Sequence, residues 1–600
     1  MLKRSGLYLT VVFFLTLGLV ACGGTAGSAN SNATGSNAAS GAGGGTSTST
    51  STPTLASITV APGSPNITAG QTQTFTATCV ASDNSQPACS TYGTVTWSSG
   101  NPSVATMSGA TATAVAAGTT TISAALNGIT GITGTTTLTV KAAIQNSNVV
   151  NHIIFMAQEN RSFDEYFGML NAYRLAQGLP AIVDDLAAAT GGANTGTITP
   201  DCTNMVACNL GYKTGTTIPS FHFATACIWD LSPFWNESHV DFNLQDPTSM
   251  TPLNNGFAWT AGGYSTSQGL QGGADYQGAR AMGYYTSQDL PYYYFMATQF
   301  ATSDRFFAPA PTRTQANRMY LFAATSQGNV YPPTVQLSAP TIFDRLQAAG
   351  ISWKIYFSDY SSGSPDTYFT YFSSSGPLMS HVVPVSQYFT DLTNGTLPQV
   401  ALIEGGYESG LDEHPLNDVQ NGSRYVSTLI NALMGSSSWS SSVFFLTYDE
   451  AGAGYDHVAP MMNGVNGANV PNPDGIKPLA LQPGDICFGT PDAPACDFTR
   501  TGFRMPLLVV SPFTKPNYVS HTPMDSTAIL KFIETRFGLQ NLNNRDAAQP
   551  PMDEFFDYSG APNATPPTPP AQPGADCDGL TNTCTGPTMP VLGCNAANIP

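Results

Sequence analysis

Two stretches of the sequence gather oxygen-bearing side chains directly after an apolar run. Residues 152–168 read HIIFMAQENRSFDEYFG, and residues 442–450 read SVFFLTYDE, although only 10% of the chain is charged. Carboxylate and amide oxygens held close together repel one another unless a divalent cation lies among them. The two stretches therefore predict a shared cation site, the alternative being that these side chains cap helices or form salt bridges.

The histidines fall in comparable settings. The chain has seven, and four of them adjoin an acid or a hydroxyl, namely His239, His414, His457 and His521. Neutral imidazole binds metal ions, and imidazolium stabilises the charge on phosphate. These neighbours are what a phosphate-cleaving centre needs. The other reading is a structural role, which we assign to His152 and His381.

Short apolar strands must position these groups. The runs HIIFMA, QVALIEG, SVFFLTYDE and MPLLVVSPF each end in polar residues, and helix-like segments such as STAILKFIETRFGL lie among them. Such runs predict an α/β domain over residues 148–558, with a mainly parallel central sheet covered on both faces. Ligands of open α/β sheets gather at the carboxyl ends of the strands, where the polar residues fall.

A second domain precedes this one. Residues 55–142 hold short alternating segments rich in Thr and Val, spaced by turn residues, which predict a small all-β sandwich. The wording VTWSSGNPSVATMSG resembles bacterial Ig-like group 2 domains, which implies a spacing or adhesive role. Residues 559–600 form a tail rich in Pro and Thr that contains cysteines.

The N-terminus predicts export. Residues 1–22 contain Lys3 and Arg4, an apolar run and then LVAC, which resembles a lipoprotein signal peptide ending in a lipobox. Lipid attachment at Cys22 would anchor the chain to a membrane, and residues 23–54 read as a flexible linker. We expect an exported bacterial lipoprotein on the periplasmic side of a membrane or at the cell surface.

Charge and cysteine content agree with that location. A net charge of −18 with only 20 Lys and Arg argues against a nucleic-acid partner. The ten cysteines other than Cys22 predict disulfides in an oxidising compartment. Spacing predicts the pairs Cys79–Cys89 and Cys487–Cys496. The pairing of six others stays open: Cys202, Cys208, Cys227, Cys577, Cys584 and Cys594.

Five motifs in order carry a family resemblance. QENRSFDEYFG, TRTQANRMY at 312–320, DEHP, TYDEAGAGYDHVAP and RMPLLVVSPFTKPNYVSHTPMD resemble the signatures of the bacterial phosphoesterase family, which contains phosphatidylcholine-type phospholipases C and acid phosphatases. The resemblance covers most of residues 150–545. It implies a fold similar to the alkaline phosphatase superfamily, a divalent metal cation and a hydroxyl nucleophile. The metal ligands it implies are Glu159, Asn160, Asp449 and Glu450.

The same resemblance implies a nucleophile and further site residues. The nucleophile falls on Thr314, three positions before Asn317, but relatives more commonly carry Pro-Thr-X-Pro-Asn-Arg than Arg313-Thr314-Gln315-Ala316-Asn317-Arg318, so Thr312 is the alternative. Asn317 and Arg318 either contact phosphate directly or begin a helix behind the nucleophile. Matching histidines, without separated roles, are His414, His457 and His521. The segment with His222, Asp230 and His239 resembles the family's substrate side.

The expected activity is therefore hydrolysis of a phosphate ester or phospholipid. A divalent cation would activate Thr314, a phosphothreonine would form, and histidine would protonate the leaving oxygen before water releases the product. A choline site would need an aromatic cage. Candidates for such a cage are Tyr292 to Phe295, Trp229 and Trp235, although aromatic side chains also pack cores. The rival hypothesis is a catalytically inactive cell-surface adhesin on the same fold.

Overall fold

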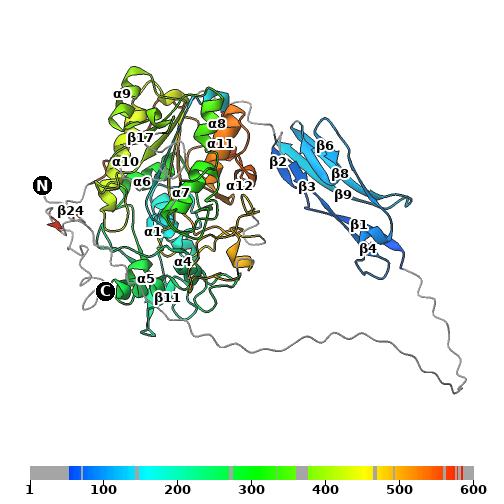
Figure 1. Ribbon diagram of the computed structural model, residues 1–600, viewed down its shortest axis with the longest axis horizontal. Helices are drawn as coiled ribbons and strands as arrows, with labels where there is room; N and C mark the ends of the chain where they lie inside the picture. The colour runs from blue at the N-terminus through cyan, green and yellow to red at the C-terminus, as the bar shows by residue number, and fades with distance from the viewer. Residues whose placement is uncertain are drawn as a thin grey trace, which may run out of the picture. The chain divides into compact units, whose positions relative to one another are not determined.

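The structure is a computed structural model of the chain (Figure 1). It describes residues 53–68, 72–115, 117–141, 147–268, 275–333, 336–359, 376–463, 469–490, 493–558, 562–573, 577–578 and 583–584. The chain divides into two compact units, residues 1–143 and 144–600. The predicted signal peptide, Cys22 and nearly all of the predicted linker lie outside the described residues. Within the described part, no helix is both long and apolar enough to cross a bilayer.

In its described residues the first unit is built from β-strands and one short 3-10 helix (Cys89–Thr91), so it is all-β as its alternating sequence predicts. Its strands are β1 (Leu55–Ala61), β2 (Asn66–Thr68), β3 (Thr72–Thr74), β4 (Thr76–Ala81), β5 (Val95–Ser99), β6 (Ala105–Ser108), β7 (Thr111–Ala114), β8 (Gly118–Leu126) and β9 (Thr133–Lys141). They form sheets of order β2-β9-β8-β5, β3-β7-β6 and β1-β4. Phe75, Ile122 and Leu138 fill the core between them. The predicted disulfide Cys79–Cys89 is confirmed.

An eight-stranded sheet forms the centre of the second unit. Its strands are, in spatial order, β18 (Val382–Pro384), β17 (Trp353–Phe357), β19 (Val400–Glu404), β10 (His152–Gln158), β20 (Ser442–Tyr448), β21 (Leu508–Val510), β15 (Ala301–Ser303) and β22 (Tyr518–Ser520). β10 pairs in parallel with β19 and β20, whereas β21 is antiparallel to both of its neighbours. The sheet is therefore mixed, and the carboxyl ends of β19, β10 and β20 meet at one edge.

Helices surround this sheet. They are α1 (Phe163–Phe167), α2 (Leu170–Ala176), α3 (Leu186–Ala189), α4 (Trp235–Phe242), α5 (Phe257–Ser267), α6 (Pro291–Gln299), α7 (Thr314–Ala323), α8 (Ile342–Ala348), α9 (Ser386–Asn394), α10 (Val419–Met434), α11 (Thr527–Phe537) and α12 (Asn544–Ala547). The unit thus combines helices with a central sheet, which confirms the predicted α/β class.

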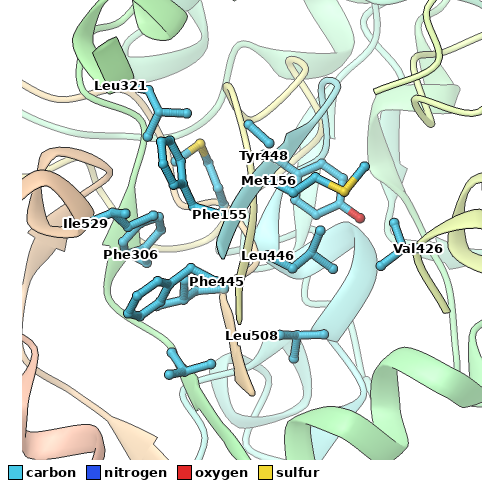
Figure 2. Packing of buried hydrophobic residues seen from close by; sticks show 14 of the residues in the cluster. Phe155, Met156, Phe306, Leu321, Val426, Phe445, Leu446, Tyr448, Leu508 and Ile529 are labelled. Atoms are coloured by element: carbon cyan, nitrogen blue, oxygen red, sulfur yellow. The ribbon is translucent and has the colours of Figure 1, made fainter. Parts of the chain in front are cut away.

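The central strands are buried on both faces, because their side chains alternate between two helical layers. Phe155 of β10 stacks against Phe343 of α8, and Phe445 of β20 meets Phe532 of α11 edge to face. On the opposite face, Met156 and Leu446 project with Tyr448 toward Val426 of α10 (Figure 2). This packing fixes β10 and β20 side by side, so the residues that follow them are held in register.

Among the described residues of the second unit there are also short strand pairs and two disulfides. The pairs are β11 (Cys208–Leu210) with β12 (Thr217–Pro219), β13 (Phe221–His222) with β14 (Gly283–Tyr284), β16 (Phe306–Phe307) with β23 (Met524–Asp525), and β24 (Cys577–Asp578) with β25 (Thr583–Cys584). The predicted disulfide Cys487–Cys496 is confirmed, and Cys202 pairs with Cys208, which the sequence left open. Cys594 lies outside the described residues.

Candidate active site

Thr314 begins α7 at the edge where the central strands end. Its hydroxyl donates to Glu159 Oε2 at 3.1 Å and lies 3.3 Å from Asn160 Oδ1. Both partners directly follow β10. The structure therefore brings the predicted nucleophile together with two predicted metal ligands. Thr312 has a different setting, because it is 2% exposed and its hydroxyl donates to Val330 O at 2.8 Å.

The acidic pair after β20 joins this group. Asp449 Oδ1 accepts hydrogen bonds from the backbone N–H groups of Asn160 at 3.0 Å and Glu450 at 2.8 Å. Glu450 Oε2 accepts one from the N–H of Gly452 at 2.8 Å. The other carboxylate oxygens, Asp449 Oδ2 and Glu450 Oε1, are buried without a hydrogen-bond partner. All four predicted ligands thus belong to one cluster with two unsatisfied oxygens.

Arg318 ties this cluster together from one turn further along α7. Its guanidinium contacts Glu159 Oε1 at 2.8 Å and Glu404 Oε2 at 3.0 Å, and it lies 3.7 Å from Asp449 Oδ2. Asn317 holds the preceding turn through Ala310 N–H and Thr312 O. These contacts favour the predicted role of a helix start behind the nucleophile over direct phosphate contact.

Glu404 is a site residue that the sequence argument did not name. It ends β19 and pairs in register with Ala157 of β10, so it lies beside Glu159. The signal was present, because QVALIEG is an apolar run that ends in an acid, as the runs before Glu159 and Asp449 do. Comparing all three strand ends would have found it.

The charges of the cluster do not balance. Glu159, Glu404, Asp449 and Glu450 are each at most 4% exposed, and Arg318 is the guanidinium that pairs with them. Burial and the neighbouring acids raise the pKa of Asp449 and of Glu450 well above the ordinary range. Burial opposes ionisation of Glu159 too, but Arg318 and His414 outweigh it and lower its pKa. Because the oxygens are buried, converging and short of positive charge, the residues fit a divalent cation.

His414 is the predicted histidine with electrostatic coupling to this cluster. Its Nδ1 donates to Pro415 O at 2.8 Å, which leaves Nε2 for another partner. The N–H groups of Leu416 and Val419 donate to Ile228 O at 2.7 Å and Ala226 O at 3.0 Å, and Asp230 lies close enough to His414 to act on its charge. Burial alone would lower the pKa of His414, but Asp230 and Glu159 raise it above the usual value.

His457 and His521 contact a second acidic group. His457 Nδ1 lies 2.7 Å from Asp164 Oδ2, and its Nε2 lies 3.1 Å from Asp184 Oδ1. His521 Nδ1 lies 2.9 Å from Asp304. We call this group the Arg504 network; its members are Asp164, Asp184, Asp304, Arg305, Asp456, His457, Arg504 and His521. The hydrogen bonds found for these two histidines therefore run within the Arg504 network.

Part of the Arg504 network also has the ligand types of a metal site. Single atoms of Asp164, Asp456 and His457 lie within 4.8 Å of one another. However, Arg504 Nη2 contacts Asp164 at 2.9 Å, and its Nε contacts Asp456 at 2.9 Å. A guanidinium already supplies the positive charge there, so these residues fit a buried ion-pair network better than a cation site.

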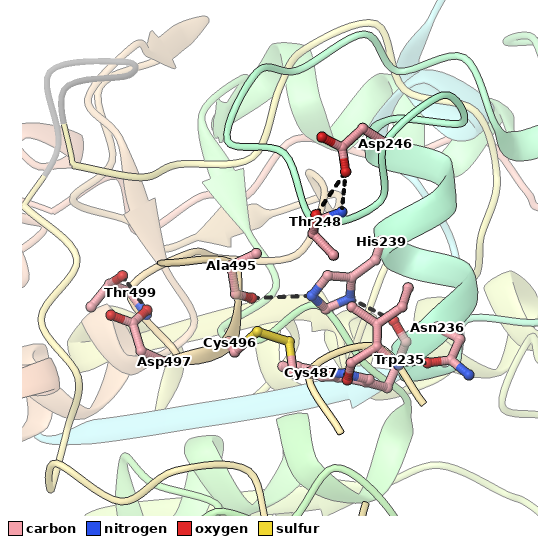
Figure 3. The surroundings of a disulfide bond; sticks show 11 residues. Trp235, Asn236, His239, Asp246, Thr248, Cys487, Ala495, Cys496, Asp497 and Thr499 are labelled. Atoms are coloured by element: carbon pink, nitrogen blue, oxygen red, sulfur yellow. Dashed lines mark hydrogen bonds between the residues drawn. A yellow bond between two sulfur atoms is a disulfide. The ribbon is translucent and has the colours of Figure 1, made fainter. Parts of the chain in front are cut away.

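The predicted substrate-side histidines have separate environments. His222 Nε2 lies 2.8 Å from Asp289 Oδ2 at a half-exposed position. His239 is fully buried on α4, where its ring nitrogens face Trp235 O at 2.6 Å and Ala495 O at 3.1 Å, beside the Cys487–Cys496 disulfide (Figure 3). Burial and the nearby Arg500 lower the pKa of His239 to about 3. Since both nitrogens face backbone carbonyls, we leave His239 out of the proposed site.

The proposed aromatic cage is largely core. Tyr292, Tyr293 and Tyr294 are each at most 1% exposed, and Trp235 is buried with its Nε1 donating to Ile486 O at 3.0 Å. Their environment is that of packing residues. Trp229 is partly exposed.

Comparison with known proteins matches both units. The model of the Phosphoesterase family matches residues 150–540, and the model of the bacterial Ig-like domain (group 2) matches residues 54–148. Non-specific phospholipase C1 of Arabidopsis thaliana is 31% identical over 52% of this chain and 57% of its own length, so this chain spans little more than half of that relative. Phospholipase C B of Mycobacterium tuberculosis is 28% identical over 70% of this chain and 80% of its own length.

A solved structure from Vibrio parahaemolyticus, described as a protein in the alkaline phosphatase superfamily, is 14% identical. It covers 42% of this chain and 62% of its own, with a TM-score of 0.27. The family match is the broader finding, because it takes in the central sheet, α7 and every residue of the Thr314 cluster. The chain belongs to the Phosphoesterase family.

Proposed function

We propose that this protein is a metal-dependent hydrolase of phosphate esters that acts through Thr314. One observation carries the proposal: the Thr314 hydroxyl lies within 3.3 Å of Glu159 and Asn160, in a cluster where the buried carboxylates outnumber the guanidinium that pairs with them. The position at the start of α7 adds support. Arg313 makes no side-chain cap there, so the first N–H groups of a ten-residue helix are open to an anionic phosphate.

The metal ligands in this proposal are Glu159, Asn160, Asp449 and Glu450. The unsatisfied oxygens of Asp449 and Glu450 support the assignment. A bound divalent cation supplies charge neutralisation for the phosphate oxygens and favours the alkoxide form of the Thr314 hydroxyl. Arg318 of α7 binds Glu159 Oε1, so that the other carboxylate oxygen, Oε2, remains directed at Thr314.

The protein's own groups then perform two displacements. Thr314 Oγ1 releases its proton to solvent, attacks phosphorus in line and forms a phosphothreonine, while His414 Nε2 gives a proton to the departing oxygen. His414 suits this task because Asp230 and Glu159 raise its pKa and favour the protonated ring. Water then gives a proton to His414 Nε2 and attacks the phosphothreonine, while the departing Thr314 oxygen takes up a proton from solvent. Phosphate or a phosphorylated head group leaves, and Thr314 and the protonated His414 are regenerated. His457 and His521 take part in this scheme indirectly, through their side-chain hydrogen bonds within the Arg504 network.

The proposed substrate is a phospholipid or a related phosphate ester. The names of the two relatives above, both phospholipases C, support this class. A fold of the alkaline phosphatase type, with a mainly parallel sheet, belongs to the same proposal, and the parallel pairing of β10 with both neighbours supports it. We further propose an exported bacterial lipoprotein, attached through Cys22 on the periplasmic side of a membrane or at the cell surface. Its disulfides support export.

One experiment tests the activity. Protein lacking residues 1–22 is assayed on p-nitrophenyl phosphate and p-nitrophenylphosphorylcholine, before and after chelation and metal restoration. We expect chelation to abolish turnover and Thr314→Ala to lower kcat by roughly a thousandfold or more. Thr312→Ala is the matched control, since its hydroxyl faces Val330 O, and it should keep most of the activity.

The outcomes separate the hypotheses. Faster turnover of the phosphorylcholine ester indicates a phospholipase C, and faster turnover of the monoester indicates a phosphatase. The mechanism is wrong if chelation has no effect and Thr314→Ala is fully active. Turnover of neither ester under any metal condition would instead favour the inactive adhesin.

A further inference from the structure

Glu413 is a fully buried carboxylate that the proposed mechanism does not use. Its Oε2 accepts hydrogen bonds from the hydroxyls of Tyr166 and Tyr448, both at 2.6 Å. Its Oε1 accepts from Tyr293 at 2.5 Å and from Gln158 Nε2 at 3.3 Å. Glu413 is 0% exposed, and four donors occupy its two oxygens. Only a carboxylate offers enough lone pairs to accept from all four.

Two of the four donors lie at the strand ends that carry the proposed metal ligands, and the other two lie on neighbouring helices. Gln158 immediately precedes Glu159 at the end of β10, and Tyr448 immediately precedes Asp449 at the end of β20. Tyr166 belongs to α1, and Tyr293 belongs to α6. One side chain therefore connects both strands that supply the proposed metal ligands.

The backbone around Glu413 makes a second set of hydrogen bonds to the residues that follow β10. Arg161 donates through Nε and Nη2 to Glu413 O at 2.9 and 2.7 Å, and the N–H of Glu159 donates to Asp412 O at 2.8 Å. Glu413 has a φ of 68°, which is unusual for a residue other than glycine. Hydrogen bonds to the side chain of Glu413 and to the backbone at Asp412 and Glu413 thus hold this segment in place.

The neighbouring helix is shaped to admit Glu413. A Cβ at Gly422 of α10 would lie 2.1 Å from Glu413 Cγ, so only glycine leaves room for this side chain. Burying a carboxylate without a direct cationic partner costs free energy, because the charge loses its hydration. An apolar residue at this position would avoid that cost. These contacts indicate that Glu413 serves to hold the surrounding residues in position.

We propose that Glu413 is a positioning residue that holds His414 and the Glu159 loop in one geometry through its four hydrogen bonds to the ends of β10 and β20, α1 and α6. The inference rests on the proposed function, since it assigns His414 and Glu159 their tasks. It adds a residue that touches neither substrate nor metal. Displacing Glu413 moves the proton donor and one metal ligand together.

The test compares two variants that disturb Glu413 differently. Glu413→Gln keeps the shape but faces two of the donors with an amide NH₂, and Gly422→Ala keeps the carboxylate but displaces it. We expect each to lower kcat on the p-nitrophenyl ester by roughly tenfold to a hundredfold, because small misplacements of catalytic groups have such effects. KM should change little. Mn²⁺ affinity, measured by EPR of the free ion, should fall by about tenfold.

A control separates positioning from loss of stability. Leu433→Ala removes buried volume from the same helix away from Glu413, so it should lower Tm while kcat and Mn²⁺ affinity stay unchanged. The inference is overturned if Glu413→Gln and Gly422→Ala both keep kcat and Mn²⁺ affinity near the wild-type values, whatever their Tm. If Glu413→Gln does not fold, Gly422→Ala and Tyr293→Phe decide the question.

The two proposals fail in different ways. Absence of turnover in the wild-type protein would refute the proposed function, whereas Mn²⁺ affinity still reports whether Glu413 holds the Glu159 loop. Wild-type turnover with unaffected variants would refute only the role of Glu413.

Discussion

At the scale of single residues, the catalytic unit holds two buried acidic groups that differ in how far cationic side chains balance their charge. In the Thr314 cluster, Arg318 is the guanidinium that pairs with the buried carboxylates. In the Arg504 network, Arg504, Arg305 and two histidines accompany the acids. The first group has more buried acids than cationic partners, whereas the acids of the second are paired with cationic side chains. This difference is why we place the metal beside Thr314.

The Arg504 network makes a prediction about pH. Burial alone would lower the pKa of His457, but Asp164 and Asp184 raise it from 6.5 to about 9 against the opposing charge of Arg504. A raised histidine pKa means that the stabilisation is complete below pH 6.5 and is lost as pH rises through about 9. The difference corresponds to about 3 kcal/mol in the free energy of unfolding.

His457→Gln should therefore destabilise the protein by about 3 kcal/mol more at pH 6 than at pH 10. Urea unfolding at the two pH values, at a fixed metal concentration, measures the difference. His381→Gln is the matched control, because the His381 hydrogen bond runs to Trp353 O. An equal loss at both pH values would contradict the assignment of His457 as a charged member of the network.

At the scale of elements, the sequence predicted the strands whose apolar runs are long. HIIFMA, QVALIE and SVFFLTY became β10, β19 and β20, because strands buried on both faces read as continuous apolar runs. Thr314 and the four proposed ligands could be named as one group because five motifs in fixed order carried them, and the structure brings these residues together. The Arg504 network and the Glu413 contacts could not, since they join segments up to 340 residues apart that only the folded sheet brings together.

Arg318 shows how one helix is set against three strands. Its guanidinium reaches Glu159 after β10, Glu404 of β19 and Asp449 after β20, so it fixes the position of Thr314 one turn earlier. Arg318→Lys keeps the charge but loses the planar fork. We expect the free energy of unfolding to fall by about 3 kcal/mol and kcat to fall by about tenfold.

Chemical denaturation and steady-state kinetics measure the two effects of Arg318→Lys. Arg545→Lys is the matched control, because Arg545 is also fully buried and pairs with Asp525 at 2.7 Å. It should lower stability to a similar degree without lowering kcat. Unchanged kcat in Arg318→Lys would show that α7 is placed by packing alone.

At the scale of the whole molecule, the chain has two units with separate cores, and the proposed active site lies in the second of them. The first unit packs around Phe75 and Ile122, and the second around the residues of β10 and β20. Every residue of the Thr314 cluster belongs to the second unit. Units with their own cores are able to fold alone.

A chain that begins at residue 144 should therefore keep kcat and KM on a soluble chromogenic ester within about twofold of the full-length values. Calorimetry of the full chain should show two unfolding transitions. Metal addition should raise the Tm of one of them, and the shortened chain should retain that transition. The double variant Cys79→Ala/Cys89→Ala in the full chain should lower the other transition alone, because this disulfide closes a loop within the first unit. Failure of the shortened chain to fold, or loss of its turnover, would show that the first unit contributes to the catalytic unit rather than acting as a separate module.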